Sequence, residues 1–415
     1  MMDKSPEVIV VGAGAAGLMA AATAAERGRQ TLLIEKNRKL GVKILMSGGT
    51  RCNLTHDTDW QGIANAFGKQ QGRFLKFALA SFDPDQVIMF FNGRGVTTKR
   101  EDTGKIFPMS DKALHVRDAL VEHALAAGAE IINETAITGI EKSTSGFKLF
   151  SEQQTFECQS LIVTIGGQSY PGCGTTGDGY AWLEGLGHSI ETPCPALTPV
   201  RIGDDWVKQL SGMTMPDVKI EVASDRKLAT QDRNDYRGSF LFTHTGCSGP
   251  APMNVSRSVT HPENNFPKQL VCDWIPDVHA ESLKELLAEE TRQQGSRQLI
   301  SWLSELVPRR LAESICETHQ VSPEVRMAEL NKQKRSMVLN GLKQSQMQIK
   351  GTLGFAKAEV TAGGVALGEV NQKTMASKLV PGLFLAGEIL DIDGPIGGYN
   401  FQAAFSTGRL AGQNA

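Results

Sequence analysis

The hydrophobic pattern at the start of the chain predicts a strand, a helix and a second strand. Val8–Val11 is an uninterrupted apolar run, which is typical of a parallel strand covered on both faces. Ala15–Arg27 is rich in small apolar residues and predicts a helix, and Thr31–Ile34 repeats the strand pattern. Together the three segments predict one βαβ unit, from which parallel sheets are built.

The pattern continues as helices and strands through residue 167. Residues 72–128 favour two helical runs, separated by an alternating segment, residues 95–110, that predicts a hairpin. Residues 146–167 predict two alternating strands followed by the buried run Leu161–Ile165. A parallel sheet with an attached β-ribbon is therefore expected.

The pattern changes near residues 192–200. Short strands separated by polar turns predict a β-barrel over 193–276 and about 346–353, and leucines at helical spacing predict helices over 277–345. Within the helical part, Ser322 followed by Pro323 predicts a helix start. Buried strand patterns then return, so the expected fold is α/β, with a discontinuous Rossmann-like domain (1–192 and 354–415) and an insertion (193–353).

Composition and charge exclude several classes of protein. A net charge of −2 argues against general nucleic-acid binding, although a local basic face stays open. Seven cysteines without a C-x-x-C pair fit reduced thiols in a cytoplasmic protein better than zinc ribbons or a disulfide framework. The apolar N-terminal region fits the βαβ unit better than a targeting signal, and the sequence predicts no membrane span.

A glycine fingerprint follows the first strand. Gly12, Gly14 and Gly17 have the G-x-G-x-x-G spacing, which allows a tight turn, a close approach to a diphosphate and helix packing on the strand. Glu35 ends the second strand, where an acid accepts hydrogen bonds from ribose hydroxyls and disfavours NADP. In this context a dinucleotide site is the favoured interpretation, and a purely structural glycine turn is the alternative.

Two later segments favour FAD over NAD at this site. Leu161–Gly167 is a strand that ends with Thr164 and Gly166, where the chain can lie across a dinucleotide. Gly382–Asp391 is another strand, ending in Ala-Gly-Glu, and a helix pattern follows whose N-terminus would favour a reduced, anionic flavin. The alternative is a turn and a helix start without a ligand.

The segment "KILMSGGTRCNLT", residues 43–55, suggests a chemical role of its own. It offers a nucleophile, a phosphate cradle, metal ligands or only turn chemistry. No other residues supply metal-ligand spacing, so no metal is predicted, and the Walker spacing of a phosphate loop is missing. A position along a bound flavin is the expectation that remains.

These motifs resemble those of the BaiN/RdsA (YhiN-like) family of NAD(P)/FAD-dependent oxidoreductases. The resemblance covers nearly the whole chain and rests on "KILMSGGTRCNLT", "GKIFPMSDKA", "TTGDGYAWLEGLGH", "LFTHTGCSGPAPM", "AEVTAGGV" and "LAGEILDIDGPIGGYNFQAAFSTGRLAG". The family usually has a third glycine before Arg-Cys-Asn, where this chain has Thr50. A side chain there makes the backbone less permissive.

The resemblance implies a glutathione-reductase-type FAD domain with an inserted barrel and a small helical domain. It also implies FAD contacts beyond the glycine fingerprint. These expected contacts are Ala15, Ala16, Glu35, Lys36, Lys43, Ser47, Gly48, Gly49, Thr50, Arg51, Cys52, Asn53, Ala136, Gly387, Glu388, Asp391, Asn400 and Phe401.

The resemblance further implies reduction of a conjugated C=C, with NADH or NADPH as electron donor. Some members are steroid-type enone reductases, and others form dihydrouridine in large-subunit ribosomal RNA. Either reaction needs a protein acid to supply a proton. A small-molecule reductase or oxidase acting on an enone or amine, and a flavin-binding protein without turnover, are the alternatives.

Two residues are candidates for that acid. Cys52 would qualify if Arg51 lowers its pKa, and the alternative is a small buried residue packed under the flavin. His244 in the insertion would qualify if it faces the flavin, and the alternative is a structural histidine. Asp178 is most simply a helix cap, and Tyr399 either donates a proton or stacks on the ring.

A basic segment could contact RNA. Residues 326–350 contain six basic residues against the single acid Glu329, a net charge of +5. Arg309 and Arg310 lie nearby in sequence and could extend it. Such a segment can hold phosphates, but a solvated helix face is the simpler interpretation.

Overall fold

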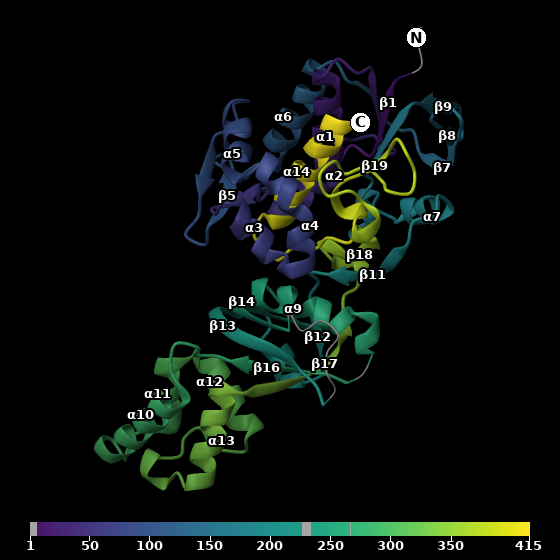
Figure 1. Cartoon of the computed structure of the whole chain (residues 1–415). Helices are drawn as coiled ribbons and strands as arrows, with labels where there is room; N and C mark the ends of the chain where they lie inside the picture. Colours follow the sequence, from purple (N-terminus) through teal and green to yellow (C-terminus); the bar gives the residue numbers. More distant parts are fainter. Residues whose placement is uncertain (1–5, 226–233, 266) are drawn as a thin grey trace. The chain divides into compact units, whose positions relative to one another are not determined.

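The computed structural model describes residues 6–225, 234–265 and 267–415. The chain divides into two compact units, and each is described by itself (Figure 1). Unit 1 comprises Met1–Pro195 and Phe355–Ala415, and unit 2 comprises Ala196–Gly354. All seven cysteines belong to the described residues and are buried free thiols.

A five-stranded parallel sheet forms the centre of unit 1. Its strand order is β19-β10-β1-β2-β6, with each adjacent pair parallel. The short apolar runs of the sequence form these strands because both faces of the sheet are covered. The expected parallel sheet is confirmed. The strands are β1 (Val8–Val11), β2 (Thr31–Ile34), β6 (Glu130–Ile132), β10 (Ser160–Val163) and β19 (Leu383–Leu385).

Two helices from opposite ends of the sequence pack together on this sheet. Helices α1 (Ala15–Glu26) and α14 (Tyr399–Asn414) lie side by side in Figure 1. A Cβ on Gly408 would lie 2.2 Å from the Ala16 carbonyl oxygen, and one on Gly412 would lie 2.4 Å from that of Ala20. Small residues on both helices therefore allow the C-terminal segment to complete the domain that the N-terminus begins.

Shorter elements surround the sheet. The hairpin expected between the helical runs is present as β4 and β5, which pair antiparallel. The remaining strands are β3 (Thr55–His56), β4 (Thr98–Arg100), β5 (Lys105–Pro108), β7 (Ile137–Lys142), β8 (Phe147–Ser151), β9 (Thr155–Cys158), β11 (Ile190–Ala196) and β18 (Val360–Val365). The remaining helices are α2 (Val42–Thr50), α3 (Trp60–Ala66), α4 (Gly68–Ser81), α5 (Pro84–Asn92), α6 (Ala113–Ala126), α7 (Asp178–Gly185), η1 (Pro171–Cys173), η5 (Phe355–Lys357), η6 (Leu367–Glu369) and η7 (Gly387–Ile389).

Unit 2 is built on a closed six-stranded barrel, which confirms the expected inserted barrel. Aromatic side chains fill its interior: the rings of Phe240 and Phe242 lie 5.3 Å and 5.6 Å from that of Trp274. Going round the barrel, the strands are β12 (Val200–Ile202), β15 (Gly246–Ser248), β14 (Asp235–Thr243), β13 (Thr214–Ala223), β16 (Gln269–Asp273) and β17 (Ser345–Thr352).

Helices complete unit 2, and one expected helix start is wrong. Ser322 caps no helix; its carbonyl accepts from the Val325 N–H in a turn. The next α-helix begins at Lys332, because the Asn331 side chain caps it by accepting from the Lys334 N–H at 2.8 Å. The helices are α8 (Asp205–Gln209), α9 (Pro250–Thr260), η3 (Pro262–Asn264), α10 (Ala280–Gln293), α11 (Leu299–Leu306), α12 (Arg309–Thr318), η4 (Met327–Glu329) and α13 (Lys332–Lys343).

Helix length and polarity also bear on membrane insertion. Within the described part of the chain, every helix is too short or too polar to serve as a membrane span.

Candidate functional site

The carboxyl ends of four parallel strands meet at one edge of the unit 1 sheet. Gly12 follows β1, Glu35 follows β2, Thr164 follows β10, and Gly387 comes shortly after β19. This edge is where ligands bind in open α/β sheets. The sheet therefore gathers segments that are up to 375 residues apart in the sequence.

The glycine fingerprint adopts the backbone that a dinucleotide turn requires. Gly12 has φ +98°, and a Cβ there would lie 2.9 Å from the Thr164 carbonyl oxygen. A Cβ on Gly17 would lie 1.8 Å from the Gly12 oxygen, whereas Gly14 faces open space within 4 Å. Neighbouring backbone therefore leaves no room for a side chain at Gly12 or Gly17. The space beside Gly14 is open, and a diphosphate would approach there.

The N-terminus of α1 lies directly beside that open space. Gly14 occupies the N-cap position, and no side chain among the described residues caps the helix. Ala15 and Ala16, the first helical residues, therefore present backbone amides at the positive end of the helix dipole. An anionic diphosphate fits these donors.

Glu35 is held in place by the turn that it faces. Its Oε2 accepts from the Ala13 N–H at 2.7 Å, and its Oε1 accepts from the Asn37 backbone and side chain at 2.9 and 2.8 Å. Lys36 instead forms an ion pair with Asp178 at 2.6 Å. The prediction that Asp178 caps a helix is wrong, because Gly177 is the N-cap of α7. The Asp178 carboxylate instead accepts hydrogen bonds from the Lys36 ammonium and the Thr176 hydroxyl.

Residues 43–55 begin as a helix and then break. Helix α2 has non-helical backbone from Ser47 to Gly49, with Gly48 and Gly49 in the left-handed region. Thr50 continues there at φ +69°, and so does Cys52 at φ +63°. The break presents backbone rather than side chains, and a Cβ on Gly49 would meet nothing within 4 Å.

The expectation that Arg51 lowers the pKa of Cys52 is wrong. Cys52 is fully buried in the hydrophobic core, and burial raises the pKa of its thiol to about 12. The Arg51 guanidinium turns to Glu101 at 2.6 Å and Asp111 at 3.5 Å, above the Phe107 ring. These contacts favour the packing alternative for Cys52, since a fully buried thiol does not reach a ligand.

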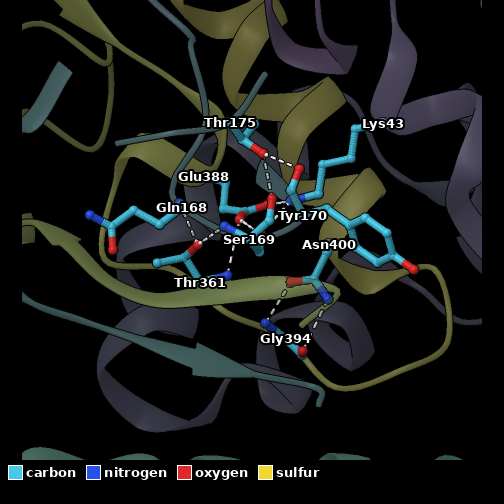
Figure 2. A network of polar contacts seen from close by, with 9 residues as sticks. All are labelled: Lys43, Gln168, Ser169, Tyr170, Thr175, Thr361, Glu388, Gly394 and Asn400. Atoms are coloured by element: carbon cyan, nitrogen blue, oxygen red, sulfur yellow. Dashed lines mark hydrogen bonds and ion pairs between the residues drawn. The ribbon is translucent and has the colours of Figure 1, made fainter. Parts of the chain in front are cut away.

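Two asparagines expected at the flavin fasten the chain instead. With its amide nitrogen toward the carbonyls of Thr55 and Ile106, Asn53 accepts from the Gly398 N–H at 2.9 Å. The Asn400 side chain accepts from the Gly394 N–H at 2.7 Å and donates to the Gly394 oxygen at 3.0 Å (Figure 2). Both side chains shape the turn that enters α14.

A polar network lies beside these turns (Figure 2). The Lys43 ammonium donates to Glu388 and to the Ser169 hydroxyl, each at 2.7 Å. The second Glu388 oxygen accepts from the Ser169 hydroxyl at 2.6 Å and the Thr361 N–H at 3.0 Å. The Thr361 hydroxyl in turn accepts from the Gln168 and Ser169 amides at 2.8 and 3.0 Å. The network links α2, β18 and η7.

The remaining expected contacts occupy the same unit. The Thr164 hydroxyl donates to the Val11 and Gly12 oxygens at 2.8 and 3.0 Å. Gly387 has φ +76° and donates its N–H to Thr407, and Asp391 accepts from the Gly363 N–H at 3.1 Å. The other three residues of the set are Ala136, which is exposed, Gly166, which has φ +76°, and Phe401, which is half-buried.

No role was predicted from the sequence for Glu359 or His56. Glu359, in "AEVTAGGV", is exposed, and its carboxylate has no hydrogen bond or ion pair to any described residue. Surrounding protein raises its pKa, against the opposing charges of Lys43 and Lys105. His56 stacks on Tyr399 with ring centroids 4.8 Å apart, so Tyr399 stacks on a protein ring. Position directly before a buried strand is the signal that could have indicated Glu359.

His244 and the basic segment belong to unit 2. His244 is exposed in the turn between β14 and β15. The basic segment carries less uncompensated charge than the sequence indicates, because Lys343 pairs with Asp273 at 2.6 Å. Arg309 pairs with Glu313 at 2.8 Å, and Arg310 donates to the Gln209 oxygen at 2.6 Å.

The sheet edge fits FAD by its donors and its open space. The uncapped α1 amides and the space at Gly14 suit a diphosphate, and the Glu35 carboxylate suits ribose hydroxyls. The backbone of Gly49 is open enough for a planar ring system to approach, whereas a Cβ on Gly48 would lie 3.2 Å from the Asn53 backbone nitrogen. Residues that would hold FAD are thus present in unit 1.

Comparison with known sequences identifies full-length relatives. A family model described as "HI0933-like protein Rossmann domain" matches residues 6–414. The chain is 32% identical to "Ribosomal RNA dihydrouridine synthase" of Escherichia coli (strain K12), covering 98% of this chain and 97% of that protein. It is 28% identical to "3-dehydro-bile acid delta(4,6)-reductase" of Clostridium scindens, covering 98% of each.

Solved structures share the fold. 3-Ketosteroid delta1-dehydrogenase from Sterolibacterium denitrificans matches with a TM-score of 0.50 at 14% identity, covering 98% of each chain. At this identity the likeness concerns the fold alone.

Proposed function

This FAD-dependent oxidoreductase belongs to the HI0933-like family, and we propose that it reduces a conjugated C=C, namely a uridine of large-subunit ribosomal RNA to dihydrouridine. The observation that carries the proposal is the full-length similarity, at 32% identity, to a protein named ribosomal RNA dihydrouridine synthase. A second protein of that name, from Haemophilus influenzae, is also 32% identical, with 98% of this chain covered.

The site chemistry supports this choice. When bound and reduced by the proposed nicotinamide donor, the flavin would supply a hydride for the β-carbon of a conjugated carbonyl, and a protein acid would supply the proton. We expect the glycine turn and α1 to hold the diphosphate, Glu35 the ribose, and the segment around Gly48 and Gly49 the flavin side. NADH or NADPH is the proposed electron donor, and the cytoplasm is the proposed compartment.

The proton donor is a separate question for this chain's residues. Cys52 is a poor candidate because its thiol is fully buried and does not reach a ligand. Glu359 is a better one, since the residue is exposed and its carboxylate has no hydrogen bond or ion pair to any described residue. His244 is exposed and stays a proposal from the sequence.

Ribosomal RNA from a deletion strain tests the function. Mass spectrometry of nucleosides from that RNA should show loss of one dihydrouridine, and the wild-type gene should restore it. A Gly14→Val gene should not restore it, because the side chain fills the space left for the diphosphate. Unchanged dihydrouridine in the deletion strain would remove the proposed substrate.

A small-molecule enone is the second candidate substrate. The similarity to the bile-acid reductase, which covers 98% of both chains, favours it. Oxidation of NADH or NADPH by the purified, FAD-loaded protein should then accelerate with a panel of steroid-type enones. Acceleration by enones together with unchanged RNA dihydrouridine would select this candidate over the first.

A further inference from the structure

A cavity of about 340 Å³ opens on unit 2, whereas the residues assigned to FAD belong to unit 1. It lies between α8, α12, α13 and the start of β17. Its size is at the lower end of the range for small-molecule sites, about 300–1,000 Å³. The lining residues include Trp206, Thr318, His319, Asn340, Gln344 and Gln346.

One wall of the cavity is an indole. Trp206 is half-buried on α8, and its ring lies 6.4 Å from that of the core residue Phe242. The ring is therefore supported from behind by the barrel. A supported, accessible aromatic face is a stacking platform for planar ligands.

The other walls carry hydrogen-bonding groups without protein partners. Asn340, Gln344 and Gln346 are exposed and His319 is half-buried, and among the described residues none forms a hydrogen bond with these four side chains, so their polar groups are open to solvent or to a ligand. Each amide offers two donors and an acceptor, as the edge of a base requires. Burial lowers the pKa of His319, so its ring is neutral near pH 7 and offers one donor and one acceptor.

The charges lie outside the cavity. Its lining, drawn entirely from described residues, contains no Asp, Glu, Lys or Arg. Nearby, Arg310 reaches the last residue of α8, and Lys350 lies on the same exposed face of β17 as Gln346. Four residues of strand separate the two side chains, about 13 Å. Asp205, Glu313 and Glu317 also adjoin lining residues; Asp205 pairs with Lys208 at 2.7 Å and Glu313 with Arg309 at 2.8 Å. The surroundings therefore carry both signs, and the uncharged lining suits an uncharged planar group.

We propose that this cavity binds one unpaired nucleobase of single-stranded RNA, which stacks on Trp206 and is hydrogen-bonded by Asn340, Gln344 and Gln346. The proposal rests on the proposed function and deepens it, since it assigns part of RNA recognition to unit 2. Lys350 and Arg310 then lie where the adjoining phosphates run. The same chemistry would also accept the adenine of a nicotinamide dinucleotide, so the test separates the two sources.

Binding of a labelled oligonucleotide to the full-length protein tests the inference. The probe is a fluorescein-labelled single-stranded RNA of twelve uridines, followed by fluorescence anisotropy. Stacking on an aromatic residue is worth about 1–3 kcal/mol per base, so Trp206→Ala should weaken binding about 5- to 150-fold. Trp206→Phe should stay within about threefold. The salt dependence of both variants should equal that of the wild type, because phosphate contacts are unchanged.

Controls separate stacking from charge and from folding. Gln293→Ala changes an exposed amide on α10 that does not line the cavity, and it should bind like the wild type. An abasic ribose-phosphate oligomer should bind the wild type and Trp206→Ala equally. If Trp206→Ala does not fold, Trp206→Phe and Asn340→Ala replace it. Asn340→Ala should then weaken RNA binding, and Trp206→Phe should not.

Several outcomes would overturn the inference. Binding within twofold of wild type for both Trp206→Ala and Asn340→Ala would show that the cavity holds no base. Displacement of the RNA by NADH or AMP, but not by UMP, would assign the cavity to the dinucleotide, and displacement by neutral monosaccharides would assign it to a sugar. If the deletion strain loses the dihydrouridine but Trp206→Ala and Asn340→Ala bind RNA like the wild type, the cavity inference is wrong and the proposed function stands. If dihydrouridine is unchanged in the deletion strain but Trp206→Ala weakens RNA binding, the proposed substrate is wrong and the cavity inference stands.

Discussion

Replacing Thr50 by glycine should stabilise the protein, although such a substitution usually destabilises one. Thr50 has φ +69°, in the left-handed region that L-residues rarely adopt. Its side chain is exposed, and no hydrogen bond joins its hydroxyl to another described residue. The folded state therefore loses almost nothing when the side chain is removed, and it sheds the backbone strain.

The size of the effect follows from two opposing contributions. The left-handed conformation costs a non-glycine residue about 1–2 kcal/mol. Glycine increases the conformational freedom of the unfolded chain, which costs about 0.5–1 kcal/mol. The free energy of unfolding of Thr50→Gly should therefore exceed that of the wild type by up to about 1.5 kcal/mol, with about 0.75 kcal/mol at the middle of both ranges.

Urea unfolding of the FAD-free protein measures this difference. The transition of unit 1 should be analysed by itself, because a two-unit chain need not unfold in one step. Thr155→Gly is the matched control: Thr155 is exposed in strand β9 and lacks a positive φ, so glycine there should destabilise by about 1 kcal/mol. Equal destabilisation by both variants would refute the strain argument.

Three further predictions concern the same unit. Cys52→Ala should keep FAD and turnover and lose about 1 kcal/mol of stability, because the thiol packs in the core; an FAD-loaded variant with a hundredfold lower turnover would restore Cys52 as the acid. Burial raises the pKa of Cys52 to about 12, from about 8.5 for an exposed thiol. The folded state keeps a proton that the unfolded state releases, so this contribution is complete below about pH 8.5 and is lost toward pH 12. Urea midpoints between pH 8.5 and 11 should therefore fall less steeply in Cys52→Ala, and equal slopes would contradict the raised pKa. Glu388→Gln leaves Lys43 without its partly buried ion pair and should cost about 1–3 kcal/mol, whereas Glu281→Gln, in an exposed pair, should change stability by under about 0.5 kcal/mol. Similar losses for the two glutamates, measured by urea unfolding, would contradict a structural role for the Figure 2 network.

The parts of the fold that sequence could predict depend on local patterns. The strands at Val8–Val11 and Thr31–Ile34 and the helix between them are encoded by apolar runs and glycine spacing within thirty residues. The barrel was also predictable, because long strands such as β13 and β17 alternate buried and exposed residues. In each case the burial of an element can be inferred from its own residues.

The predictions that proved wrong depend on distant partners. Asp178 lies at the start of a helix, but Gly177 is the cap, and Lys36, 142 residues away, donates to the Asp178 carboxylate. Arg51 is adjacent to Cys52 in sequence, yet Glu101 and Asp111 position its guanidinium elsewhere. Sequence spacing does not report which of several possible partners a long charged side chain will choose.

The basic segment shows how the same limit affects functional inference. Its net charge of +5 suggested phosphate binding, but Lys343 is neutralised by Asp273 and also donates to the Ile275 and Val278 carbonyls, at 3.1 and 2.6 Å. The guanidinium of Arg335 donates to the Leu330 carbonyl at 2.9 Å. Part of the charge therefore stabilises the junction of α13 with its own unit. Base stacking at Trp206 would add a contribution to RNA recognition by unit 2 that does not depend on this charge.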